Sequence, residues 1–108
     1  MSDEPLLECW DPALDGELSE FAMRRKLESR GFACATWVYP PSTHFPPHRH
    51  ADDKWDAVLS GRFRITLYGR DLDLGPGDCV FVPRGVSHSA SVLGTQAVVS
   101  IDAVRVRG

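Results

Sequence analysis

The 108-residue sequence lacks several features that would assign it to a large class of proteins. It has no run of 18 apolar residues, which excludes a membrane-spanning helix. Its first residues, "MSDEPLLECWD", are acidic and carry neither the basic nor the apolar part of a secretory signal. With 12 basic and 15 acidic residues the net charge is −3, so the basic excess of a nucleic-acid-binding protein is missing. We therefore expect no membrane and no nucleic acid among its partners.

Cysteine is also scarce, and its spacing excludes a disulfide framework. Cys9, Cys34 and Cys79 lie far apart and form no Cys-x-x-Cys pair. An odd number of separated thiols is typical of a reducing compartment. We expect a cytoplasmic protein, with Cys79 packed as a small hydrophobic side chain.

The N-terminal third is the one region with helical character. Residues 1–16 are acidic, contain two prolines at positions 5 and 12, and are predicted to form an arm with at most short structure. Residues 17–30, "ELSEFAMRRKLESR", contain no glycine or proline and predict one short helix that ends at Gly31. In this helix Leu18, Phe21 and Ala22 share a face, with Met23 and Leu27 to one side.

From residue 32 onward the sequence consists of short strand-like segments. "FACATWVY" is rich in aromatic and β-branched residues, and "RFRITLYG" alternates polar and apolar positions. Turn signals such as "GPG" recur every eight to twelve residues, and no helical spacer separates the strands. This pattern predicts an all-β sandwich or barrel over residues 32–106, within a single domain of residues 17–108.

Histidine is concentrated in the stretch "HFPPHRHADDKWDAVLSG", residues 44–61. His48 and His50 are two positions apart, so on a strand they would point to the same face. His88 follows a tight Pro83-x-Gly85 turn and is a candidate third ligand. Imidazole nitrogens bind divalent transition metals such as Zn, Fe, Ni and Mn, among which the sequence does not discriminate. His44 is a candidate additional ligand or a residue of the rim.

These residues resemble the two motifs of the cupin superfamily. The first motif, G(x)5HxH(x)3-4E(x)6G, is matched by His48, His50 and Gly61, and the second, G(x)5PxG(x)2H(x)3N, by Gly77, Pro83, Gly85 and His88. Three positions depart: Ser42 replaces the first glycine, Val92 the final asparagine and Lys54 the acidic ligand. The resemblance implies a small single-domain microbial cupin of the conserved-barrel type. Its fold would be a double-stranded β-helix, or jelly roll, with the metal held in one mouth, and it would form a homodimer.

Lys54 places a positive charge where the family has a carboxylate. If one strand continues through this stretch, His48, His50, Asp52, Lys54 and Asp56 share a parity. Three arrangements are then open. In the first, Lys54 pairs with Asp52 or Asp56 and lies away from the metal. In the second, it adds its charge to a three-histidine metal site that suits an anionic substrate, and in the third the site holds no metal and Lys54 and the histidines bind another ligand. Asp52 and Asp56 are themselves candidate replacements for the missing carboxylate.

Three classes of function are compatible with this constellation. The first is a metal-dependent enzyme, of dioxygenase or isomerase type, acting on a small and anionic organic molecule. The second is a non-catalytic module that binds or senses a small molecule, with or without metal. A structural or storage role is the third, and packing alone gives no reason for such clustering of histidines. Whether the protein is an enzyme stays open at this point.

Overall fold

The computed structural model describes residues 3–107. The first two residues of the predicted arm and the last residue of the predicted domain therefore lie outside the described range. Along the chain the elements are β1 (Leu6–Glu8), α1 (Pro12–Asp15), α2 (Glu20–Glu28), β2 (Phe32–Tyr39), β3 (His44–His48), β4 (Lys54–Ser60), β5 (Arg62–Leu67), β6 (Arg70–Leu74), β7 (Cys79–Val82), β8 (His88–Leu93) and β9 (Val98–Arg105).

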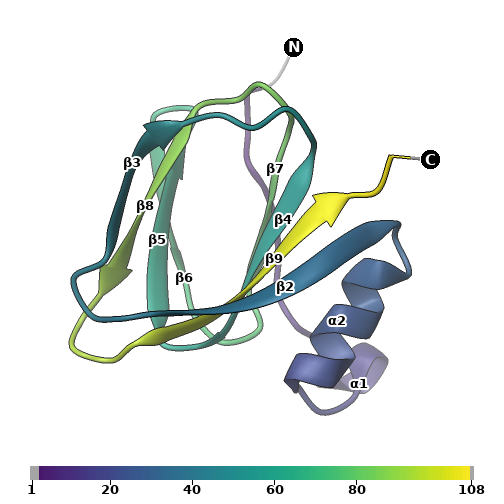
Figure 1. Ribbon diagram of the computed structural model, residues 1–108. Coiled ribbons are helices and arrows are strands. Elements are labelled where there is room, and N and C mark those ends of the chain that lie inside the picture. Colours follow the sequence, from purple (N-terminus) through teal and green to yellow (C-terminus); the bar gives the residue numbers. More distant parts are fainter. Residues whose placement is uncertain (1–2, 108) are drawn as a thin grey trace.

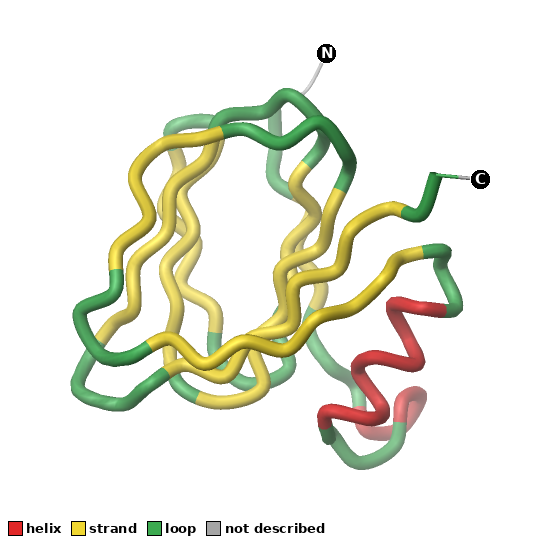
Figure 2. The backbone as a smooth tube through the Cα atoms, viewed as in Figure 1, coloured by secondary structure: helices red, strands yellow, loops and turns green. Residues whose placement is uncertain are grey.

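Two antiparallel sheets face each other and form a barrel (Figure 1). One sheet has five strands in the order β1-β7-β4-β9-β2, and the other has four in the order β3-β8-β5-β6. The backbone trace shows the two sheets as opposite walls, with the helices packed outside the five-stranded wall (Figure 2). The predicted all-β jelly roll with a short N-terminal helix is confirmed.

The central strand β4 of the five-stranded sheet is buried on both faces, which explains its sequence. Residues Lys54 to Val58 are all buried, although they alternate in character. Lys54 and Asp56 line the interior of the barrel, whereas Trp55 and Ala57 pack with the helix residues Met23 and Leu27 in a second core. Successive side chains of a strand point to opposite faces, so β4 supplies polar groups to the barrel and apolar groups to the helix layer.

The helix α2 is shorter than the predicted range of 17–30. Ser19 caps it by accepting a 3.0 Å hydrogen bond from the backbone N–H of Ala22, so the first helical residue is Glu20. Met23 and Leu27 are fully buried, while Phe21 is 70% exposed. Of the two groups of apolar residues noted in the sequence, the Met23–Leu27 side therefore packs against the sheet, and Phe21 does not.

The N-terminal arm contains short structure, as predicted. β1 adds three residues to the edge of the five-stranded sheet beside β7, and α1 is a single turn capped by Asp11. Within residues 3–107, none of the helices has the length and apolar character needed to cross a membrane. The cytoplasmic location stays a prediction.

Candidate metal centre

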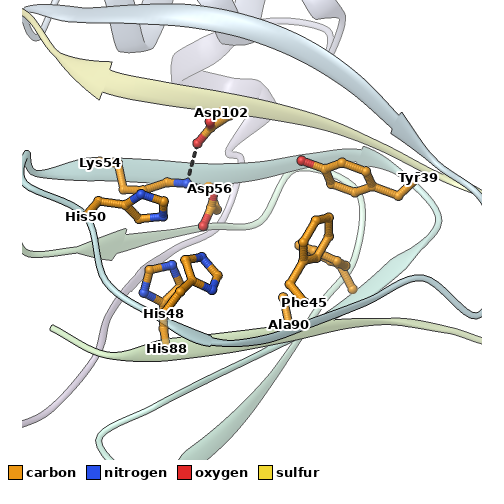
Figure 3. Close-up of a pocket in the computed structure, with 10 residues that line it drawn as sticks. Tyr39, Phe45, His48, His50, Lys54, Asp56, His88, Ala90 and Asp102 are labelled. Atoms are coloured by element: carbon orange, nitrogen blue, oxygen red, sulfur yellow. Dashed lines mark ion pairs between the residues drawn. The ribbon is translucent and has the colours of Figure 1, made fainter.

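Three histidines meet at one end of the barrel interior (Figure 3). His48 ends β3 and His88 begins β8, and the two residues are paired in register across the ladder. His50 comes from the loop that follows β3. One ligand nitrogen from each ring lies within 4.8 Å of the others, so a single ion between them can be reached by all three.

Two of these imidazoles are oriented by hydrogen bonds to the backbone carbonyl of the residue two positions earlier. The Nδ1 of His48 lies 2.7 Å from the carbonyl oxygen of Pro46, and the Nδ1 of His88 lies 3.1 Å from that of Val86. A carbonyl only accepts, so Nδ1 carries the proton and donates it, and in the neutral ring this leaves Nε2 with a free lone pair. Metal-binding histidines are commonly held in this way.

The loop of residues 49–53 holds His50 in place through its backbone. The carbonyl oxygen of His50 accepts a 2.9 Å hydrogen bond from the N–H of Gly85, and the N–H of Arg84 donates to Asp53 Oδ1 at 2.7 Å. The loop is thereby tied to the Pro83-x-Gly85 turn that positions His88. This loop interrupts the single strand expected from His48 to Asp56, so the shared parity does not extend across it.

Two of the three histidines, His50 and His88, have a lowered pKa, which favours the uncharged form that a metal ligand must have. Burial lowers the pKa of the His88 imidazole to about 4, and its neighbours His48 and Lys54 lower it further against the hydrogen bond with Val86. Burial also lowers the pKa of His50, as does the Lys54 ammonium. At neutral pH these rings therefore present lone pairs rather than positive charge.

Lys54 is buried and is neutralised by two carboxylates. Its Nζ lies 3.2 Å from Asp56 Oδ1 and 2.5 Å from Asp102 Oδ1. The partner on the same strand is Asp56, as in the first of the three arrangements considered for Lys54, but the ammonium also lines the cavity beside the histidines, as in the second. Asp102 on β9 was not anticipated, because it meets Lys54 through the pairing of β9 with β4, a long-range register that no local pattern specifies.

The three charged groups form a cluster that we call the Lys54 clamp: Lys54, Asp56 and Asp102. Burial raises the pKa of Asp56 to about 6. The nearby Lys54 ammonium limits this rise, and the negative charge of Asp102 adds to it. The flanking carboxylates raise the pKa of Lys54 against the effect of its burial. The ammonium is therefore held in its charged form at neutral pH.

The cluster borders a cavity of about 200 Å³ that has a polar and an apolar part. The polar part consists of the three histidines and the Lys54 clamp. The apolar part is lined by Tyr39, Phe45, Phe63 and Ala90. Figure 3 shows Tyr39, Phe45 and Ala90 on the side away from the histidines. Tyr39, the last residue of β2, was not anticipated from the sequence.

His44 and Asp52, two other candidate residues, lie outside this pocket. The exposed His44 has its Nδ1 2.7 Å from the Ser91 hydroxyl on β8. Asp52 forms a 2.6 Å ion pair with the Nε of Arg107 near the C-terminus. Asp52 does not share the interior face of Lys54 and Asp56 because it belongs to the loop of residues 49–53. His44 does not share the face of His48 because the register of β3 shifts at the proline pair between Phe45 and His48.

The sequence of the chain matches the model of a known protein family. The family model of the cupin domain matches residues 35–104, which include all three histidines. The chain belongs to the cupin family. A curated relative, the uncharacterized protein y4oW of Sinorhizobium fredii, is 32% identical over 53 residues, which are 49% of this chain. The match spans about a quarter (24%) of that relative's length.

Solved structures share the cupin fold. KdgF from Halomonas sp. superimposes with a TM-score of 0.62 at 24% identity and covers 71% of each chain. A cupin superfamily protein from Desulfitobacterium hafniense has a TM-score of 0.62 at 14% identity, with coverage of 99% of this chain and 82% of that one. A conserved-barrel protein from Salinispora arenicola gives 0.62 at 18%, covering 70% and 64%. At these identities the likeness concerns the fold.

The departures of this cupin from the family motifs have visible structural settings. Ser42 has a φ of 70°, a left-handed conformation that favours the glycine found there in the motif. Val92, in place of asparagine, is 7% exposed and packs in the core of the barrel. Gly61, by contrast, keeps the glycine of the motif; its φ is 84°, and a Cβ there would lie 2.5 Å from the carbonyl oxygen of Ala97.

The donor set fits a divalent transition metal. Three neutral imidazoles suit such ions, and two of them have the orienting hydrogen bonds described above. A carboxylate ligand is not supplied at the usual position of a cupin, because the ammonium of Lys54 stands there. His48, His50 and His88 are thus the residues that would hold the ion, and an ion with three protein ligands keeps coordination positions for a small molecule.

Proposed function

We propose that this cupin binds a divalent transition metal through His48, His50 and His88, and that a small organic molecule binds beside the metal in the pocket. The observation that supports this most strongly is the pair of hydrogen bonds that fix His48 and His88 with Nε2 free. Such a bond sets both the tautomer and the direction of the ring. Histidines that merely fill space have no need of this shared orientation.

A bound metal would supply a Lewis acid that polarises an oxygen of the ligand. The chain's own residues would bind and orient the ligand, with its apolar part against Tyr39, Phe45 and Phe63. The expected enzyme class, a dioxygenase or an isomerase acting on a small anionic molecule, stays part of this proposal.

Metal content tests the proposal directly. The protein is stripped with a chelator, reloaded separately with Zn, Ni, Mn and Fe(II), desalted, and analysed by mass spectrometry for metal per chain. We expect close to one equivalent of at least one ion in the wild type and a large loss in His88→Ala. His44→Ala is the matched control and should retain the metal. A wild-type protein with only trace metal, or equal loss in both variants, would contradict the proposal.

The alternative is a non-catalytic module that binds or senses a small molecule. One observation favours it: the ionisable side chains next to the histidines, Lys54, Asp56 and Asp102, are engaged with one another. A thermal-shift screen of small organic acids, followed by product analysis with each metal, separates the two functions. Stabilisation without turnover under any metal would support the binding module, whereas turnover would support the enzyme.

The predicted homodimer belongs to the same proposal and rests on separate features. β2 is an edge strand of the five-stranded sheet, and its Trp37 and Val38 are 53% and 63% exposed. An apolar edge strand is a natural place for a second chain to pair. Light scattering on the purified protein measures the oligomeric state, and Trp37→Lys should weaken a dimer formed in this way.

A further inference from the structure

We propose that the pocket recognises a small monocarboxylate with a compact apolar or aromatic body, and that Lys54 contacts the carboxylate of this ligand. The inference rests on the proposed function, since it takes a divalent ion to be present on the three histidines. It goes further by naming the ligand class and by giving Lys54 a role in place of the acidic residue that it replaces.

The first argument is the balance of charge in the polar part of the pocket. Neutral imidazoles bring no charge to the ion that they bind. A divalent ion, the Lys54 ammonium and the carboxylates of Asp56 and Asp102 together leave one net positive charge. Charge in a partly buried site is costly unless it is paired. A monocarboxylate neutralises this charge, a neutral ligand leaves it in place, and a phosphate dianion reverses it.

The second argument is the position of the ammonium. An ammonium has three N–H donors, one more than the two carboxylates, of Asp56 and Asp102, with which Lys54 forms ion pairs. Lys54 also lines the cavity together with the histidines. Its side chain is only 9% exposed, so its position is fixed before any ligand arrives. The remaining donor can therefore meet a carboxylate oxygen with little loss of side-chain entropy.

The third argument is the apolar wall opposite the clamp. The ring centroids of Tyr39 and Phe45 lie 4.9 Å apart, and those of Tyr39 and Phe63 lie 5.5 Å apart. Rings this close contact one another and form one continuous apolar surface. Such a wall suits a flat aromatic or branched aliphatic body.

The volume limits the size of that body. A cavity of about 200 Å³ is smaller than the roughly 300–1,000 Å³ of pockets for drug-sized ligands. Aromatic acids such as benzoate and 3-phenylpropanoate are small enough to serve as probes. Their amides have nearly the same shape without the charge, and phenyl phosphate carries a second negative charge.

Calorimetric titration of zinc-loaded protein tests the proposal, with the zinc content measured before any ligand is added. We expect benzoate or 3-phenylpropanoate to bind at least about tenfold more tightly than the matching amide, as charge-assisted contacts do. Equal affinity for acid and amide would overturn the inference while leaving the metal site intact. A protein that retains nickel, manganese or iron instead of zinc is titrated in that form, and failure to retain any of the four ions would overturn both the inference and the proposed function.

Two variants test the clamp itself. Lys54→Met should weaken binding of the acid by about tenfold or more at unchanged zinc content. The other lysine of the chain provides the matched control. Lys26→Met removes the same charge outside the pocket and should leave the affinity for the acid unchanged. An acid affinity unchanged in Lys54→Met would overturn the role of Lys54.

Asp102→Asn provides a test in the opposite direction and does not depend on the folding of the lysine variant. Removal of one negative charge leaves the Lys54–Asp56 pair and adds to the net positive charge of the pocket. Phenyl phosphate should then bind more tightly than it does to the wild type, by about tenfold. A merely structural role for Asp102 predicts no such gain, and its absence would overturn the charge-balance argument.

Discussion

Asp56 on β4 and Asp102 on β9 lie opposite each other in the ladder, and one ammonium, that of Lys54, contacts both carboxylates. Two acidic side chains placed face to face inside a barrel would repel each other. The lysine between them removes this repulsion, and each aspartate in turn compensates for the burial of the lysine. The three residues are therefore interdependent in stability as well as in charge.

Lys54→Met should destabilise the protein because it leaves the facing aspartates without a cation. We expect a loss of about 3 kcal/mol in the free energy of unfolding, as for other broken buried ion pairs. Urea denaturation at pH 7 measures it. Lys26→Met, which breaks the more exposed pair with Asp15, should lose less than about 1 kcal/mol. Equal losses in the two variants would contradict the account of the clamp.

The pH dependence of stability in metal-free protein should change in a defined direction in Asp56→Asn. The pKa of Asp56 is raised from 3.8 to about 6 in the folded state, so its contribution to stability falls as the pH rises from about 4 to 6. The pKa of His88 is lowered from 6.5 to about 4, so its contribution rises over the same range. The two slopes oppose each other in the wild type.

Asp56→Asn removes the falling contribution, and the stability of the variant should therefore rise more steeply between pH 4 and 6.5 than that of the wild type. His88→Asn should have the opposite effect and make the curve flatter or descending. Urea denaturation at a series of pH values, with chelator present, gives both curves. Parallel curves for all three proteins would refute these assignments of the pKa shifts.

Ser42→Gly should stabilise the protein by about 1 kcal/mol, because the left-handed conformation costs about that much for a residue with a Cβ. Ser42 occupies a turn in which the N–H of Thr43 donates to the carbonyl oxygen of Pro40 at 3.2 Å, and its φ is 70°. The control is Ser29→Gly at a φ of −64°, which should destabilise slightly. Thermal unfolding of both variants measures whether the stability rises in Ser42→Gly and falls in Ser29→Gly.

Gly61→Ala should be more damaging than Gly69→Ala, although both glycines have positive φ. At Gly61 a Cβ would lie 2.5 Å from the Ala97 carbonyl oxygen, whereas at Gly69 no atom of residues 3–107 would lie within 4 Å of it. We expect about 1 kcal/mol for the conformation alone at Gly69, and at least about 2 kcal/mol at Gly61, where overpacking adds to it. Chemical denaturation measures the difference, and equal losses would show that the contact is relaxed easily.

Much of the fold and the histidine cluster could be predicted because the signals are local. The alternation of β5 and the glycine-containing turns specify strands without reference to the rest of the chain. The motif spacings around His48, His50 and His88 place the imidazoles through short turns and one adjacent strand pair. Each of these features is encoded within a few residues of the position that it determines.

The remainder of the site depends on relationships that no local pattern carries. Asp102 joins Lys54 through the register of β9 against β4, and Tyr39 enters the pocket from the end of β2. The parity argument placed Asp52 beside Lys54 because it assumed an unbroken strand, whereas hydrogen bonds to Arg84 and Gly85 hold residues 49–53 as a loop. Such contacts join residues that are far apart in the sequence, so they cannot be predicted from local patterns and are found only in the three-dimensional structure.

The two-sided burial of β4 has a consequence for insertions and deletions in this protein. A slip of one residue in this strand would carry the indole of Trp55 into the barrel and the ammonium of Lys54 beneath the helix, at positions where neither has a partner. Packing of the helices against Trp55 and Ala57 therefore fixes the register of β4, and with it the positions of Lys54 and Asp56 in the pocket. The described helix residues are not themselves among those that line the pocket. Changes of length are expected to be tolerated on the surface before they are tolerated anywhere between Lys54 and Val58.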